Sequence, residues 1–244
     1  MAVKPQIKGL EEKWNDRADH YDPDLGFWET ERHLVKKYFG KKGTVLEIGC
    51  GAGRTLVPLA KMGFKVIGLD FSPEMLKRAG NKVKKFKLEG GVKLVEANAV
   101  KIPLPDKSVD YVFIPFNSLD CVFPVTERNK AITEISRVLK PGGLLLQSFH
   151  NIICIPGRFL FWYWLPKNVL SWLIDLGRNG GYIVNKGIPE FNTTVPAECK
   201  RFEAVGLEHL ETVFHREFPR TWLKKFLMFF RRSQALVVMR KKGS

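Results

Sequence analysis

A carboxylate and three closely spaced glycines follow an apolar run early in the chain. The stretch VLEIGCGAGR, residues 45–54, places Glu47 two residues before Gly49, with Gly51 and Gly53 after it. A glycine-rich turn after a strand is typical of a nucleotide site, because glycines let the backbone approach the ligand closely. The stretch therefore predicts a cofactor site, and the acid indicates which class of ligand the site takes.

Glu47 favours a cationic ligand over a nicotinamide dinucleotide. In the dinucleotide fingerprint G-x-G-x-x-G a third glycine would stand at position 54, where this chain has Arg54. A carboxylate would repel the pyrophosphate, whereas it would attract an ammonium or sulfonium group. Asp70 ends the next expected strand, where it can accept hydrogen bonds from ribose hydroxyls. A ribose together with a cation describes S-adenosylmethionine.

Four stretches of the chain resemble, in the same order, those of the class I S-adenosylmethionine-dependent methyltransferases. They are VLEIGCGAGR (45–54), GLDFSPEML (68–76), EANAVKIPLPDKSVDYV (96–112) and RVLKPGGLLLQSF (137–149). The resemblance covers about residues 11–150, with a helix-strand-strand close expected at 197–240. It implies S-adenosylmethionine as the cofactor and S-adenosylhomocysteine as the product.

The resemblance also assigns roles to residues after the second and third expected strands. Asp70 would bind the ribose, and Phe71 would lie against the adenine. Asn98 takes the place of a common aspartate beside the adenine amine, where its amide oxygen can still accept a hydrogen bond. Ala99 would offer a backbone N–H to the same ring.

The N-terminal segment resembles the cap of the same family. Residues 1–40 are expected to form cap helices, and WNDRADHYD (14–22) carries the resemblance. Trp14, Arg17 and Tyr21 would then close over the cofactor. Ordinary helix packing and solvation explain these three residues equally well, so both interpretations stay open.

Apolar runs alternate with helical patterns along the chain as far as Phe149. Such alternation is typical of a mostly parallel sheet with helices on both faces. We expect strands at 44–49, 65–70, 92–97, 109–115, 144–149, 207–214 and 234–240, and helices at 55–62, 73–85, 126–139 and 197–205. The predicted fold class is α/β, a doubly wound, mostly parallel seven-stranded sheet of the Rossmann-like methyltransferase type. No linker interrupts residues 1–244, so we expect a single methyltransferase domain.

Methyl transfer from a sulfonium is an in-line displacement, so the protein mainly aligns the acceptor, and a base matters only for a protonated or weak nucleophile. Ligands of open α/β sheets gather at the carboxyl ends of strands, which places Asn117, Ser118, Asp120 and His150 near the methyl group. Imidazole is well suited to a base near neutral pH, so His150 is the candidate catalytic residue, while a packing role for it stays open. The residues expected to bind the cofactor are Tyr21, Glu47, Gly49, Cys50, Gly51, Gly53, Asp70, Phe71, Asn98, Ala99 and Asn117.

The acceptor has to be inferred from the irregular part of the chain, because insertions rather than the core determine the substrate. Residues 151–195 are longer and more aromatic than one crossover helix requires, so we expect an aromatic-rich helical insertion that covers the substrate. Five aromatic residues between Phe159 and Trp164 must pack on the body, line a pocket or contact lipid. A small, apolar or lipid-like acceptor follows. A helical hairpin that only enlarges the core is the alternative.

No stretch of the sequence predicts a transmembrane helix. Prolines and charges interrupt residues 152–177 before the ~20 apolar residues that span a bilayer are reached. The stretch RTWLKKFLMFFRR (220–232) predicts a basic amphipathic helix, which either contacts an anionic membrane surface or buries its apolar face in the domain. Residues 1–30 contain no apolar core of a secretory signal, which favours a cytoplasmic protein.

The net charge of +15, from 40 Lys and Arg against 25 Asp and Glu, favours an anionic partner such as RNA, acidic lipid or a phosphorylated metabolite. A solvated basic surface is the alternative. Residues 77–93 carry seven Lys or Arg and one Glu, so an RNA (tRNA or rRNA) methyltransferase is the second functional hypothesis. A non-catalytic cofactor-binding scaffold is the third. The four cysteines lack C-x-x-C spacing, so neither a metal site nor a disulfide framework is expected.

Overall fold

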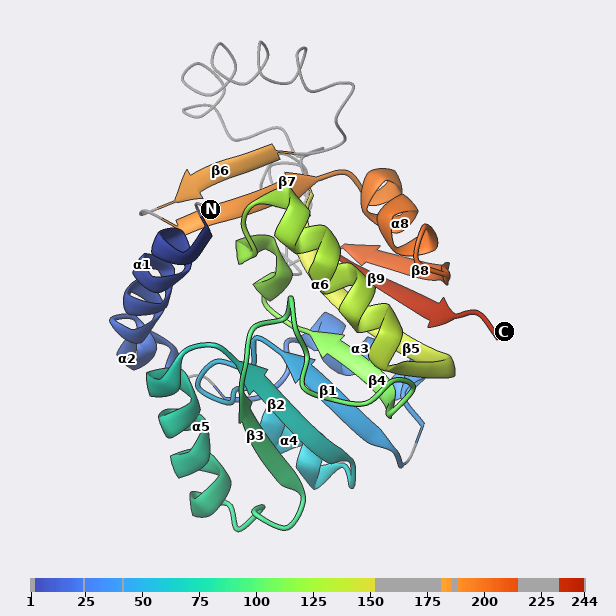
Figure 1. Ribbon diagram of the computed structural model, residues 1–244. Coiled ribbons are helices and arrows are strands. Elements are labelled where there is room, and N and C mark those ends of the chain that lie inside the picture. The colour runs from blue at the N-terminus through green and yellow to red at the C-terminus, as the bar shows by residue number, and fades with distance from the viewer. Residues whose placement is uncertain are drawn as a thin grey trace, which may run out of the picture.

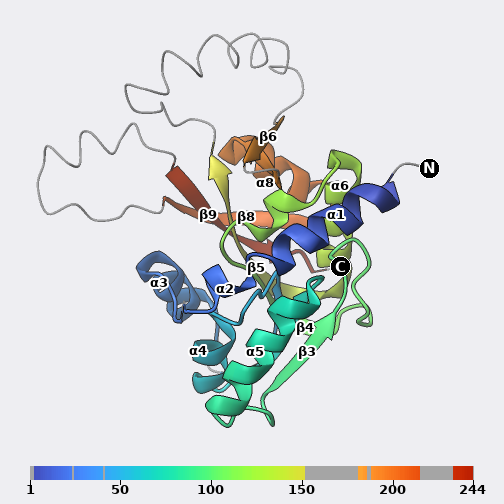
Figure 2. The same ribbon diagram turned by 90° about the vertical axis from the view of Figure 1, so that its left-hand side faces the viewer.

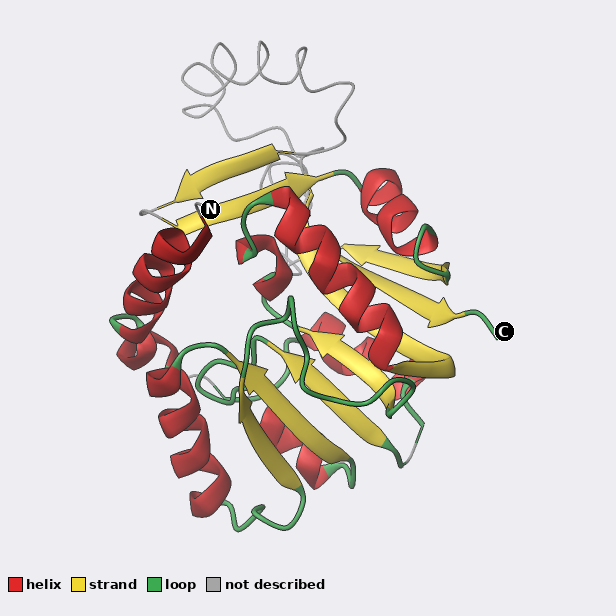
Figure 3. Ribbon diagram, in the orientation of Figure 1, coloured by secondary structure: helices red, strands yellow, loops and turns green. Residues whose placement is uncertain are grey.

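The structure of the protein is a computed structural model that describes residues 3–23, 25–40, 42–151, 181–185, 188–214 and 233–243. Nine strands of these residues form one sheet with helices on both faces (Figure 1, Figure 3). The strands are β1 (Thr44–Ile48), β2 (Lys65–Asp70), β3 (Val92–Glu96), β4 (Val109–Ile114), β5 (Leu139–Asn151), β6 (Gly181–Asn185), β7 (Ile188–Thr193), β8 (Leu207–Phe214) and β9 (Ser233–Lys241). The helices are α1 (Val3–Asn15), α2 (Ala18–Tyr21), α3 (Glu29–Tyr38), α4 (Leu56–Lys61), α5 (Pro73–Lys85), the 3₁₀ helix η1 (Ser118–Cys121), α6 (Val125–Val138) and α8 (Val195–Glu203).

The order of the strands confirms the doubly wound, mostly parallel sheet. Strands β3, β2, β1, β4 and β5 lie side by side in this order, and all are parallel. Strand β9 pairs antiparallel with β5, and β8 pairs antiparallel with β9. From β1 the sheet continues through β2 to β3 on one side, and from β4 it continues to β5 on the other. Ligands of such sheets bind at the carboxyl ends of the strands where the order reverses, here β1 and β4.

The end of the insertion differs from the helical structure expected for it. Strands β6 and β7 form an antiparallel hairpin, and β7 pairs with the end of β5 through His150↔Asn192 and Asn151↔Thr193. The β-branched residues Ile183 and Val184 favour a strand, and the open edge of β5 supplies the hydrogen-bonding partner. Residues 152–180, with the five aromatic side chains between 159 and 164, lie outside the described residues, as does the helix expected at 220–232.

The helices cover the two faces of the sheet in separate layers. Neighbouring residues of β4 show the alternation: Val112 packs in one buried cluster with residues of α6 and α8, and Phe113 packs in another with residues of α3 and α4. Apolar side chains on both faces of a strand are typical of a buried parallel sheet. In the part of the chain that the structure describes, no helix is both long enough and apolar enough to cross a bilayer.

The sequence explains where the elements beside the site begin. Helix α5 starts directly after β2 because Ser72 Oγ accepts a hydrogen bond from Met75 N (3.2 Å) and Pro73 occupies the first turn. Helices α1 and α2 contact α5 near its N-terminus (Figure 2). The N-terminal segment is thereby placed beside the carboxyl ends of the strands.

Candidate active site

A cavity of about 1260 Å³, a volume that includes the open solvent at its mouth, lies at the carboxyl ends of β1 to β4. Residues of helices α1 and α2 and of η1 contribute to its wall. Most of the residues expected to bind the cofactor line it: Tyr21, Glu47, Gly49, Cys50, Gly51, Asp70, Phe71, Asn98 and Ala99. Three expected site residues are not part of this wall, namely Gly53, Asn117 and His150.

The glycine turn is held against the end of β2. The backbone N–H groups of Gly49 and Cys50 both donate to Leu69 O, at 2.8 and 3.1 Å. Gly49 has a φ of +69°, and a Cβ on it would lie 2.4 Å from Ser118 Cβ, so only glycine fits. Gly53 serves packing: a Cβ there would lie 3.2 Å from Ala79 Cα of α5.

Glu47 presents an unmatched carboxylate oxygen in the wall of the cavity. The residue is fully buried, and Thr55 Oγ1 donates to its Oε1 at 2.6 Å. Its Oε2 is buried and has no hydrogen-bond partner among the described residues. Burial raises the pKa of Glu47 from 4.5 to about 8, against the opposing effects of the Thr55 hydrogen bond and the Arg54 charge. A cation placed at Oε2 would favour the ionised form.

Asp70 and Asn98 carry the polar groups at the ends of β2 and β3. Asp70 Oδ2 accepts from Gly51 N (2.8 Å) and Oδ1 from Ser72 N (3.0 Å); burial raises its pKa, and these N–H groups oppose the shift. Each carboxylate oxygen can accept a second hydrogen bond, which suits two hydroxyl groups. Asn98 Oδ1 already accepts from Val100 N at 3.1 Å. An amide oxygen can accept a second hydrogen bond, so both the oxygen and the nitrogen of Asn98 can still serve an adenine ring.

Arg54 anchors the glycine turn to α3. Its guanidinium forms a two-point ion pair with the buried carboxylate of Glu31 (2.7 and 2.8 Å) and donates to Gly26 O (2.8 Å). The same group lies 4.8 Å from the ring centroid of Trp28. The arginine that stands where a dinucleotide site has glycine thus has a structural function, because it ties residues 26–31 to the turn.

Two aromatic residues of the N-terminal helices, Trp14 and Tyr21, line the cavity, with their ring centroids 5.8 Å apart. Ser72 Oγ donates to Asn15 Oδ1 at 2.5 Å, and Arg78 pairs with Asp19 at 2.6 Å. Both contacts join the helices to α5. The segment that resembles the family's cap therefore lies against the cavity. Arg17 is outside the wall, and its guanidinium lies 5.8 Å from the Trp14 ring.

Sequence reasoning missed most of the wall on the side of η1. Phe116 is the clearest case, because it is 38% exposed, lines the cavity and has its ring centroid 5.6 Å from that of Tyr21. Phe116 and Asn117 have φ of +54° and +57°, a strained conformation for such residues and one that concentrates at functional sites. The other wall residues here that the sequence did not indicate are Pro115, Leu119, Cys121, Val122, Phe123 and Glu127. No local pattern marks them, because the fold alone places them.

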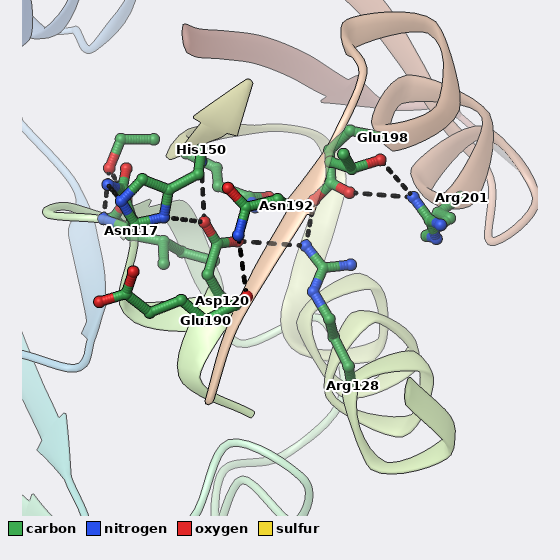
Figure 4. A network of polar contacts seen from close by, with 12 residues as sticks. Asn117, Asp120, Arg128, His150, Glu190, Asn192, Glu198 and Arg201 are labelled. Atoms are coloured by element: carbon green, nitrogen blue, oxygen red, sulfur yellow. Dashed lines mark hydrogen bonds and ion pairs between the residues drawn. The ribbon is translucent and has the colours of Figure 1, made fainter. Parts of the chain in front are cut away.

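His150 lies behind this wall, at the end of β5. Its Nδ1 is 3.0 Å from Asp120 Oδ2, and its Nε2 is 3.1 Å from Asn117 Nδ2 (Figure 4). The side chain of His150 is 17% exposed, while that of Asp120 is fully buried. Of the strand-end residues named from the sequence, Ser118 reaches the cavity, and Asn117, Asp120 and His150 contact one another.

Three comparisons connect this geometry to known proteins. A family model described as "Methyltransferase domain" matches residues 45–143. A demethylmenaquinone methyltransferase of Lysinibacillus sphaericus (strain C3-41) is 30% identical over 179 residues, which cover 67% of this chain and 74% of the relative. The enzyme of that name from Geobacillus kaustophilus (strain HTA426) is 36% identical over 135 residues, covering 51% of this chain and 56% of the relative. The chain thus spans three quarters of the first relative and about half of the second.

A solved structure shows the same fold. It is the 1,6-didemethyltoxoflavin-N1-methyltransferase of Burkholderia thailandensis with bound 1,6-didemethyltoxoflavin and S-adenosylhomocysteine. Its superposition on this chain has a TM-score of 0.71 at 14% sequence identity, and the match covers 99% of this chain and 91% of that chain. The chain belongs to the class I S-adenosylmethionine-dependent methyltransferases. Its cofactor is S-adenosylmethionine.

Proposed function

We propose that this methyltransferase transfers a methyl group to a small, apolar, lipid-like acceptor of the quinone type in its reduced, hydroxylated form. The observation that carries the proposal is the character of the wall beyond the cofactor residues. There the cavity is lined largely by apolar side chains, among them Trp14, Phe116, Leu119, Val122 and Phe123. Such a wall suits a flat apolar ring and offers little to a polyanionic chain. The similarity to demethylmenaquinone methyltransferases supports the same class of acceptor.

Asp70 and Glu47 would hold the two polar ends of the cofactor. The spare lone pairs of Asp70 fit the ribose hydroxyls, and Oε2 of Glu47 fits the positively charged methionine end. Phe71 and Ala99 would flank the adenine, with the amide nitrogen of Asn98 as a donor to the ring. Trp14 and Tyr21 would cover the ligand from the N-terminal side.

The bound cofactor supplies an electrophilic methyl group, so the residues of the chain have to align the acceptor and exclude water. Phe116 and the apolar residues of η1 would do both, because they line the same cavity as Glu47 and Asp70. His150 would serve as the general base for an acceptor hydroxyl. Its support is its contact with Asn117, whose chain neighbours Phe116 and Ser118 line the cavity.

Methyl transfer from S-adenosylmethionine labelled in the methyl group tests the proposal. Three acceptors are compared: a reduced naphthoquinone with a short prenyl chain, a total lipid extract and total RNA. We expect label in the quinol and the lipid extract, and less label with the Asp70→Ala variant at a limiting concentration of the cofactor. Asp110→Ala is the matched control, because Asp110 pairs with Lys140 and Thr44 N outside the cavity. Label recovered only in RNA would contradict the proposal, and so would the absence of label from quinol and lipid.

A further inference from the structure

A network of polar and charged side chains, three of them charged and fully buried, lies next to residues of the cavity wall. It consists of Asn117, Asp120, Arg128, His150 and Glu198, which we call the His150 network (Figure 4). The side chains of Asp120, Arg128 and Glu198 are all fully buried. Burying charges costs solvation that their mutual attraction often fails to offset, so such a network is weak evidence for a stabilising role. Its contact with His150 indicates a role in the chemistry.

The positive charge of Arg128 lies closer to Glu198 than to Asp120. Arg128 lies 2.5 Å from Glu198 Oε1 and 3.6 Å from Asp120 Oδ1, so it mainly serves Glu198. Glu198 also accepts hydrogen bonds from Gln147 Nε2 (2.8 Å) and Arg201 (3.3 Å). Asp120 therefore has only a distant share of one cation. Its close partner is His150.

The contacts around His150 define which ring nitrogen carries the proton. Asp120 Oδ2 accepts from the backbone N–H of His150 (2.8 Å) and lies 3.0 Å from Nδ1. Because Asp120 Oδ2 already accepts the backbone N–H, it acts as an acceptor toward Nδ1 as well, so Nδ1 carries the hydrogen and Nε2 keeps its lone pair. Nε2 faces the donor Asn117 Nδ2, which fits this tautomer. Burial raises the pKa of Asp120, and the His150 hydrogen bond and the Arg128 charge oppose that shift and favour the carboxylate.

His150 does not line the cavity, and Asn117 lies against its Nε2. Asn117 stands between the wall residues Phe116 and Ser118. The side-chain amide of Asn117 contacts His150 through its nitrogen, while its Oδ1 has no hydrogen-bond partner among the described residues. The backbone N–H of Asn117 donates to Ser148 Oγ at 2.7 Å. For His150 to act on an acceptor, the acceptor hydroxyl has to displace the Asn117 amide from Nε2.

We propose that Asp120 is a positioning residue that holds His150 as the base for a phenol-type hydroxyl, which narrows the acceptor to hydroxylated aromatic rings. The inference rests on the proposed function. Nε2 takes the hydroxyl proton, and the electron pair left on the phenolate forms the new bond to the methyl carbon, at oxygen or at the adjacent ring carbon. The carbon–sulfur bond breaks, and its electron pair stays on sulfur. Methylation at carbon then releases the proton of that ring carbon to solvent.

The charged groups of the network and its neighbours affect how the proton of His150 is held after the transfer, and Asp120 is the one in contact with the ring. These groups come from four elements and are Asp120 of η1, Arg128 of α6, Glu190 of β7, and Glu198 and Arg201 of α8 (Figure 4). Protonation of Nε2 turns His150 into a cation whose nearest charge is the Asp120 carboxylate. Asp120 therefore stabilises the imidazolium and keeps the ring oriented, without itself taking the proton.

The dependence of kcat/KM on the acidity of the acceptor hydroxyl distinguishes a positioning role of Asp120 from a purely structural one. We compare kcat/KM of Asp120→Asn with the wild type between pH 6 and 9, on the reduced prenyl naphthoquinone and on a ring-fluorinated analogue whose hydroxyl is ionised at the assay pH. The variant should lose about 100-fold on the weakly acidic quinol and less than about 10-fold on the ionised analogue, because the latter needs no base. Asp110→Asn is the control and should match the wild type on both. Equal losses on the two acceptors, or no loss, would overturn the proposal.

The ¹⁵N NMR spectrum of His150 tests the role of Asp120 without any knowledge of the acceptor. The ¹⁵N spectrum of the wild-type protein should show His150 with the hydrogen on Nδ1, and Asp120→Asn should shift the hydrogen toward Nε2. S-adenosylhomocysteine should bind the variant as tightly as the wild type. If Asp120→Asn does not fold, His150→Gln, at a partly exposed side chain, should show the same dependence on acceptor acidity. Wild-type protein that methylates neither quinol contradicts the proposed function, whereas a wild-type His150 with the hydrogen on Nε2 contradicts this inference.

Discussion

We expect Glu47→Gln to remove most of the proton release that accompanies cofactor binding. Burial raises the pKa of Glu47 to about 8, so at pH 7 the empty site holds this carboxyl about 90% protonated. A positively charged ligand at Oε2 favours the ionised form, and binding should therefore release about 0.9 proton from Glu47 at pH 7 and about 0.1 at pH 9. Glutamine cannot ionise, so this contribution vanishes in the variant.

The same pKa predicts how the ligand-free protein responds to pH. A group whose pKa rises from 4.5 to about 8 on folding contributes stability that is fully present below pH 4.5 and is lost as the pH rises to about 8. At 1.36 kcal/mol per pH unit this loss amounts to about 5 kcal/mol of unfolding free energy. The unfolding free energy of Glu47→Gln should therefore fall much less than that of the wild type between pH 5 and 8.

Calorimetry in two buffers of different ionisation enthalpy measures the number of protons released. The difference between wild type and Glu47→Gln isolates Glu47, because any titration of the ligand's own amine is common to both. Glu89→Gln is the control, because Glu89 is exposed and lies outside the cavity wall. Equal proton release by the wild type and Glu47→Gln at pH 7 would refute the assignment of Glu47 to the cationic end of the cofactor.

Three further substitutions test other parts of the site. Asp70→Ala should weaken S-adenosylhomocysteine binding by ~1–3 kcal/mol without unfolding the protein, and an unchanged dissociation constant would remove Asp70 from the ribose site. Gly49→Ala forces an alanine into a φ of +69° and against Ser118, so urea unfolding should show a loss of about 1–3 kcal/mol; wild-type stability would contradict the steric argument. Phe116→Ala should raise the KM for the quinol and leave S-adenosylhomocysteine affinity unchanged, and the opposite pattern would move Phe116 to the cofactor side.

Much of the fold follows from local signals in the sequence. The bounds of β2 and α5 match the predicted residues, because an apolar run ends at an acid and Ser72-Pro73 begins the helix. The β6–β7 hairpin was not predicted. Its pairing depends on the free edge at the end of β5, which lies more than 30 residues earlier in the chain and leaves no mark in the local pattern.

The candidate site also contains residues that the sequence indicated and contacts that only the fold creates. Glu47, Asp70 and Phe71 lie in the cavity wall at the strand ends where the sequence placed them, because a strand and the turn after it are contiguous. The contact of Asp120 with His150 joins residues from two strand ends, and the Arg128–Glu198 pair joins helices 70 positions apart. Such pairings arise from tertiary packing, so one sequence names the candidates and leaves their partners undetermined. The binding and catalytic roles of these residues stay predictions.

A crystal structure of the protein with S-adenosylhomocysteine tests the central claim most directly. We predict the ligand in the cavity at the carboxyl ends of β1 to β4, with both ribose hydroxyls within hydrogen-bonding distance of the Asp70 carboxylate. Its methionine end should lie on the side of Glu47, and its sulfur should face Phe116. A ligand bound elsewhere, or one in this cavity whose ribose does not contact Asp70, would contradict the account.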